Sequence, residues 1–125
     1  MTKIFVYGTL RSDDVTGNCR IMERDGGLRL EAGCTIEGTL HDCGWFPAVR
    51  LAEGTGRTVV GEVWEVTPAG LAALDRYEGQ LYCRRRVTVR TADGRDISGC
   101  EVYEGVSVGS LPVIASGDWL NREEG

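Results

Sequence analysis

The sequence predicts one α+β domain over residues 1–125, built as a small mixed, mainly antiparallel β-barrel with one or two flanking helices. Three observations support this prediction. Short runs of aromatic and β-branched residues outnumber the helical patterns. Helical and strand patterns do not alternate in the repeating order that a parallel sheet needs. A chain of 125 residues fits one domain, and it contains no internal repeat, linker or low-complexity segment.

The N-terminal residues predict a buried strand followed by a short helix. Residues 3–7 are aromatic and β-branched, and the run stops at Gly8, which is typical of a strand that ends in a tight turn. Residues 12–26 are polar, with three apolar residues at helical spacing, and we expect a short helix there. These three residues are Val15, Cys19 and Met22.

The next segments predict strands separated by glycine-containing breaks. Residues 28–40 form one or two strands, broken near Gly33 and Gly38. Residues 41–47 are rich in turn formers and predict a loop, and residues 48–52 predict a short strand.

The strongest strand pattern covers residues 57–66, after a turn at residues 53–56. We expect a β-bulge near Gly61, to reconcile the apolar residues on either side of it.

The clearest helix follows this strand. Thr67 is a good N-cap, and Pro68 is suited to the first helical position. Gly79 is placed to end the helix in a left-handed conformation. The apolar face consists of Leu71, Leu74 and either Tyr77 or Glu78.

The C-terminal part predicts a β-hairpin and an irregular tail. Residues 82–91 and 97–103 read as strands, and the Ala-Asp-Gly turn at residues 92–94 joins them. The tail from Glu104 contains glycines and a proline and predicts no regular element.

The charge balance argues against two classes of partner. The net charge is −5, whereas nucleic acids and anionic membrane surfaces require a basic footprint. The run from Arg84 to Arg86 is a local exception. It is either a solvated strand face or a positive wall beside a pocket that receives an anion.

Cysteine usage and the N-terminus indicate a cytoplasmic protein. The five cysteines are an odd number and none has Cys-x-x-Cys spacing, so we expect reduced, mostly buried thiols and no zinc site. We expect no secretory signal, because Met1 is followed almost at once by the first strand. No apolar stretch approaches the ~20 residues that span a bilayer.

The first candidate site is the turn after the first strand. Gly8, Thr9 and Leu10 could present consecutive backbone amides to an anion, and Gly8 would allow close approach. Arg11 could add a guanidinium that suits a carboxylate. The alternative is an ordinary strand-to-loop turn.

The second candidate is Glu78, in the last turn of the predicted helix. A carboxylate at a helix C-terminus is disfavoured by the helix dipole, and burial would raise its pKa toward the range of a general base. The alternative is an exposed glutamate bonded to a neighbour such as Arg76. A Cys–His hydrolase that uses His41 is a third hypothesis, but no cysteine has the setting of a nucleophile, and we expect His41 in a loop.

Several segments together resemble the γ-glutamylcyclotransferase-like superfamily, including its AIG2-like and γ-glutamylamine cyclotransferase branches. They occur in the family's order and cover nearly the whole chain. The segments are V-Y-G-T-L-R (6–11), F-P-A-V (46–49), V-V-G-E-V-W-E-V (59–66), L-A-A-L-D-R-Y-E-G (71–79), L-Y-C-R-R-R-V-T-V (81–89) and I-A-S-G-D-W (114–119).

The resemblance implies a small β-barrel with a cavity at one end, and release of 5-oxoproline from a γ-glutamyl amide without cofactor or metal. It implies that Glu78 is the general acid/base and that the amides of residues 8–10 hold the substrate carboxylate. Tyr7, Tyr82 and Tyr103 match positions that line the cavity. The alternative on the same fold is a non-catalytic module that binds a small carboxylate. The sequence identifies neither the leaving amine nor the oligomeric state.

Overall fold

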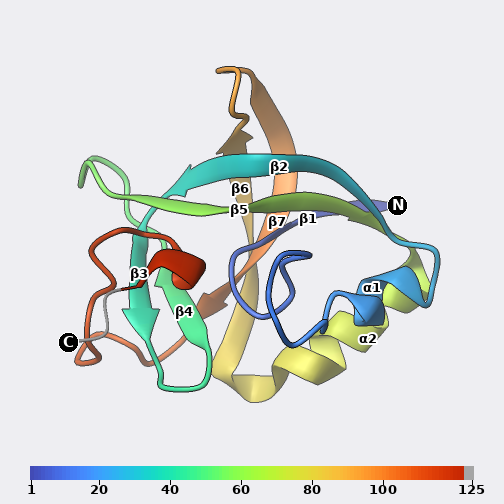
Figure 1. The fold of residues 1–125 in the computed structure, drawn as a ribbon, viewed down its shortest axis with the longest axis horizontal. Coiled ribbons are helices and arrows are strands. Elements are labelled where there is room, and N and C mark those ends of the chain that lie inside the picture. The colour runs from blue at the N-terminus through green and yellow to red at the C-terminus, as the bar shows by residue number, and fades with distance from the viewer. Residues whose placement is uncertain (123–125) are drawn as a thin grey trace.

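Five strands close into a mixed β-barrel, which confirms the predicted fold class. A computed structural model describes residues 1–122. Around the barrel the strand order is β1-β5-β2-β6-β7, and a parallel pairing of β1 with β7 closes it, whereas the other neighbours in this ring are antiparallel (Figure 1). The strands are β1 (Thr2–Val6), β2 (Leu28–Glu37), β5 (Thr58–Val66), β6 (Tyr82–Arg90) and β7 (Asp96–Gly105).

A short hairpin extends the sheet beyond β7. It is formed by β3 (Thr39–Asp42) and β4 (Pro47–Arg50), and β4 runs parallel to the end of β7. The C-terminal segment lies beside β3 in Figure 1, where the amide of Ile114 donates to the carbonyl of Leu40 at 2.8 Å. This pairing continues β3 to Asp42, so the predicted loop at residues 41–47 is too long and His41 lies in a strand.

The bulge predicted near Gly61 is not present in β5. β5 pairs with β1 without a register shift, and the irregularities fall in its other partner, β2. No bulge is needed, because alternation with a period of two already places Val59 and Val63 on the same face. Gly61 serves close packing instead: a Cβ atom there would lie 2.2 Å from the carbonyl oxygen of Val6.

The main helix follows the prediction closely. α2 (Pro68–Glu78) begins after Thr67, whose side chain accepts a hydrogen bond from the amide of Gly70. Gly79 ends it with φ of 67°, and the short 3₁₀ helix η1 (Gly79–Leu81) leads into β6.

The other helical segments differ from the prediction. The first helix, α1 (Arg20–Glu23), covers only part of the predicted segment, and turns occupy most of residues 8–19. A second 3₁₀ helix, η2 (Trp119–Asn121), lies in the tail that was predicted to be irregular. Among residues 1–122, no helix is both long and apolar enough to cross a membrane.

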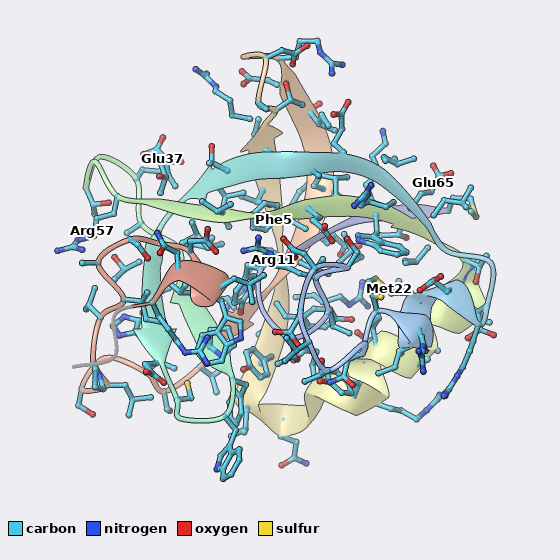
Figure 2. All side chains as sticks on the ribbon, in the orientation of Figure 1. Phe5, Arg11, Met22, Glu37, Arg57 and Glu65 are labelled. Atoms are coloured by element: carbon cyan, nitrogen blue, oxygen red, sulfur yellow. The ribbon has the colours of Figure 1, made fainter. Side chains whose placement is uncertain are left out.

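Two apolar clusters stabilise the fold. One fills the barrel and includes Phe5, whereas the other lies between the barrel wall and the helices and includes Met22 and Leu74. Figure 2 shows Phe5 and Arg11 toward the middle of the molecule and Glu65 at its edge. Because the second cluster joins α2 to β1 and β5, it fixes the end of α2 beside the end of β1.

Candidate active site

A cavity of about 380 Å³ opens at one end of the barrel. Its wall comes from places where elements end or begin: the end of β1, the start of β4, the end of α2, the start of β6 and the later part of β7. The structure therefore brings most of the predicted site residues to one hollow. They are Tyr7, Gly8, Thr9, Leu10, Glu78, Tyr82 and Tyr103.

The turn after β1 lies in the wall of this cavity and has free backbone donors. The turn is closed by the amide of Arg11, which donates to the carbonyl of Gly8 at 3.0 Å. Within residues 1–122, the amides of Gly8, Thr9 and Leu10 donate no hydrogen bond. Adjacent unpaired amides at a cavity wall form a site that attracts an anion such as a carboxylate.

Arg11 does not lie in the cavity wall, so the structure does not place it where it could bind substrate directly. Its guanidinium is buried and donates to both carboxylate oxygens of Asp13, at 3.0 and 2.9 Å. It also donates to Asp118 at 2.7 Å. The two carboxylates hold the arginine in the interior, where it ties the turn after β1 to the C-terminal segment.

Glu62 is a second anchor of the same turn and was not predicted. It is only 2% exposed, and its carboxylate accepts hydrogen bonds from the amide and hydroxyl of Ser12 at 2.8 and 2.6 Å. The indole of Trp64 donates to it at 3.1 Å, and Arg29 lies 3.6 Å away. The sequence signal for this role was an acidic residue inside an apolar strand, because a buried carboxylate needs hydrogen-bond or charged partners.

Glu78 is the only charged residue in the cavity wall of the described chain. Burial of its carboxyl group raises the pKa from the ordinary 4.5 to about 7. Its carboxylate accepts no hydrogen bond from any group within residues 1–122. A carboxyl group that titrates near neutrality can both accept and return a proton at physiological pH.

A direct contact joins the end of α2 to the turn after β1. The hydroxyl groups of Tyr77 and Thr9 lie 2.9 Å apart, and the side-chain amide of Asn18 donates to the same tyrosine oxygen at 2.9 Å. Because Tyr77 precedes Glu78, these bonds fix the helix end that carries the carboxylate against the turn that carries the free amides.

Tyr7, Tyr82 and Tyr103, three of the four tyrosines in the cavity wall, use their hydroxyl groups to hold the wall together. Tyr82 donates to the carbonyl of Pro47 at 2.7 Å, and Tyr103 donates to Asp75 at 2.7 Å. Burial raises the pKa of Tyr7, Tyr82 and Tyr103 well above the usual value, so all three stay neutral. They shape the cavity, and Glu78 is left as the group in its wall able to exchange a proton near neutrality.

Tyr7 has a structural role that can be measured. Its hydroxyl donates to the carbonyl of Tyr103 at 2.6 Å and accepts from the amide of Val49 at 3.1 Å, and all three residues are buried. Tyr7→Phe should lower the free energy of unfolding by about 1–3 kcal/mol, because both backbone groups lose their partner. Urea unfolding measures this loss. Tyr77→Phe is the control, since its hydroxyl is exposed and water can replace it; equal losses in the two variants would contradict the prediction.

Other candidates from the sequence lie outside the cavity wall. His41 is buried in β3, with Nδ1 3.0 Å from the carbonyl oxygen of Leu111. Burial raises the pKa of the Cys43 thiol, which opposes the thiolate that a Cys–His hydrolase needs. Arg84 pairs with Asp75 and Glu101 outside the cavity wall, so the arginine run does not form a positive wall there.

An apolar rim of the cavity was also missed from the sequence. Trp45 lies in the turn between β3 and β4 and is 90% exposed, and Leu81 on η1 is 61% exposed. Next to Trp45, Phe46 packs against Tyr82 with ring centroids 6.3 Å apart. A turn-rich segment has no periodic pattern from which a cavity wall could be inferred.

Comparison with known proteins gives consistent matches over nearly the whole chain. Residues 4–121 match the family model described as "Gamma-glutamyl cyclotransferase, AIG2-like". The "Gamma-glutamylcyclotransferase family protein YtfP" of Escherichia coli K12 is 34% identical over 125 residues, which cover 98% of this chain and 99% of the relative. The "Gamma-glutamylaminecyclotransferase" of Rattus norvegicus is 30% identical over 122 residues, covering 82% of this chain and 77% of the rat protein.

Solved structures show the same barrel. The crystal structure of an AIG2-like protein from Mus musculus matches with a TM-score of 0.75 and 28% identity, over 90% of this chain and 85% of the mouse chain. A crystal structure of YkqA from Bacillus subtilis matches with a TM-score of 0.74 and 26% identity, over 94% of this chain and 39% of that chain.

Proposed function

This chain belongs to the AIG2-like gamma-glutamyl cyclotransferase family, and from that premise we propose that it releases 5-oxoproline and a free amine from a γ-glutamyl amide. The family and its relatives indicate γ-glutamylcyclotransferase-like activity. The observation that supports the proposed release of 5-oxoproline is the shared cavity, which has Glu78 and the unpaired amides of residues 8–10 in its wall.

The proposed reaction needs no nucleophile from the protein. The α-amine of the substrate attacks its own γ-carbonyl carbon, a new C–N bond closes the five-membered ring, and the bond to the leaving nitrogen breaks. The protein must hold the substrate folded, and well-oriented intramolecular attack can be worth ~7–11 kcal/mol of the barrier. The amides of Gly8, Thr9 and Leu10 would bind the α-carboxylate and so set this position.

Glu78 would carry protons from the α-nitrogen to the leaving nitrogen. The ionised carboxylate takes a proton from the α-ammonium group, which frees the amine for attack. The ring nitrogen gives up a second proton as the new C–N bond forms. The protonated carboxyl returns one proton to the leaving nitrogen, and the released amine takes up the other and departs as an ammonium ion. Acid–base help of this kind contributes ~10²- to 10⁴-fold. The raised pKa suits both halves of the cycle.

The test is a panel of γ-glutamyl compounds incubated with the protein, with 5-oxoproline detected by mass spectrometry. We expect 5-oxoproline and free amine in equal amounts. If the compounds bind but are recovered unchanged, the non-catalytic binding module on the same fold replaces this proposal.

Activity should depend on pH through the ionisation of Glu78. Its pKa of about 7 means that protons compete for the base below neutrality. We therefore expect kcat/KM to fall as pH decreases through about 7, and to be about tenfold below its plateau one pH unit lower. Initial rates between pH 5.5 and 9 measure this limb. A rate that does not change from pH 5.5 to pH 7.5 would contradict the role of Glu78 as base.

A further inference from the structure

The cavity has two chemically different walls. The polar wall contains Thr9, Asn18 and Tyr77, and it adjoins the free amides. Thr9 and Asn18 each form a hydrogen bond with the hydroxyl of Tyr77. The apolar wall is formed by the β3–β4 turn and the starts of β4 and β6, together with η1, and contains Trp45, Phe46, Pro47, Leu81 and Tyr82. The polar wall accounts for a γ-glutamyl head group, but the apolar wall has no part in the cyclisation described above.

No basic side chain lines the cavity in the described part of the chain. Arg11, which follows Leu10, and Arg84, which lies two residues after Tyr82, are each paired with two carboxylates. Arg76 precedes Tyr77 on α2, but it is exposed and does not line the cavity. A second carboxylate on the substrate, beyond the one that the backbone amides can hold, would find no cation in the wall. The net charge of −5 adds to this disadvantage.

Hydrogen bonds hold the apolar wall in place. The turn that carries Trp45 is closed by two hydrogen bonds: the amide of Cys43 donates to the carbonyl of Phe46 at 3.0 Å, and the amide of Gly44 donates to the side chain of Asp42 at 2.7 Å. Tyr82 joins β6 to β4 through its bond to Pro47 at 2.7 Å. An indole that is 90% exposed on a fixed turn at a cavity mouth is available for a ligand.

We propose that the apolar wall is the subsite for the leaving amine and that it selects γ-glutamyl amides of uncharged, apolar or aromatic amines. This inference rests on the proposed function. The leaving nitrogen must lie beside Glu78 to receive a proton from it. Leu81 is the last residue of η1, which begins directly after Glu78. The substituent on that nitrogen then extends along Leu81 and under Trp45.

Three substrates that differ by one group each test the inference. γ-Glutamylphenethylamide and γ-glutamylphenylalanine differ only in a carboxylate, and γ-glutamylethylamide lacks the ring. We expect kcat/KM for the phenethylamide to exceed that of the ethylamide by at least about tenfold, since one apolar group in a fitted pocket is worth about 10- to 200-fold. We expect an excess of at least about tenfold over γ-glutamylphenylalanine as well, because its second carboxylate finds no cation in the described cavity wall. Equal rates for the phenethylamide and either of the other two would overturn the inference while leaving the proposed function intact. Absence of 5-oxoproline from all three, when other γ-glutamyl compounds are cyclised, would overturn the inference alone, and its absence from the whole panel would overturn both.

A substitution locates the subsite. Trp45→Ala should reduce the preference for the phenethylamide over the ethylamide about tenfold, measured as the ratio of the two kcat/KM values. Leu28→Ala is the matched control, because Leu28 is 63% exposed and lies outside the cavity wall; it should leave the ratio unchanged. Calorimetric binding of the phenethylamide to Glu78→Gln, with and without Trp45→Ala, gives a readout that does not depend on turnover. A ratio and an affinity that do not respond to Trp45→Ala would overturn the assignment.

Discussion

Replacing Glu78 by glutamine is expected to lower turnover at least about 100-fold while the fold and substrate binding are retained. Glutamine has nearly the same shape and cannot take the proton from the α-amine. The backbone amides of residues 8–10 that would hold the substrate carboxylate are untouched by the change. The measurement is single-turnover release of 5-oxoproline, together with calorimetric binding of the substrate to the variant. Near wild-type release would remove Glu78 from the mechanism.

The same variant carries its own control for folding. Because the pKa of Glu78 is raised in the folded protein, the folded state keeps the proton between pH 4.5 and about 7, whereas the unfolded state loses it. The stability of the wild type relative to the glutamine variant therefore falls as pH rises through this window. At pH 8 the variant should be more stable by about 1–3 kcal/mol, and at pH 4 the difference should vanish. A less stable variant at pH 8 would mean that lost activity reflects lost structure.

Local sequence signals predicted the elements that hold the candidate site. Thr67 and Gly79 are chemically specific markers of helix ends, and they place Glu78 in the last turn of α2. Gly8 marks the end of β1 in the same way. That the ends of α2 and β1 share one cavity depends on the tertiary structure. The sequence indicated it only through its ordered resemblance to a family.

Long-range partners could not be predicted from the pattern of the chain. Arg11 follows the amide turn directly, so it looked like part of the site, but Asp118 lies 107 residues away in sequence and holds its guanidinium inside the molecule. Trp45 lies in a turn without periodicity, and only the packing of β4 against β6 turns its neighbourhood into a cavity wall. In both cases the role depends on which segment comes to lie opposite, and local propensity carries no information on that.

Gly8→Ala should lower kcat/KM by about 100-fold without unfolding the protein. A Cβ atom at residue 8 would lie 2.6 and 2.8 Å from two ring carbons of Pro47, which is closer than such atoms approach. Pro47 begins β4 and accepts the hydrogen bond of Tyr82, so it resists movement. The turn at residues 8–10 is left to shift, and a displacement of about 1 Å in a positioning group can cost about 10²-fold in rate.

The pattern of kinetic loss distinguishes this displacement from general damage. The free amides would act on the substrate carboxylate, so Gly8→Ala should raise KM as well as lower kcat, whereas Glu78→Gln should act on kcat alone. Gly109→Ala is the matched control, because no atom lies within 4 Å of a Cβ atom there and the backbone φ is not positive. A Gly8→Ala protein with the kinetics of Gly109→Ala would show that the amides do not position the substrate. Proton transfer by Glu78 would then need another anchor for the carboxylate, and no basic side chain of the described cavity wall supplies one.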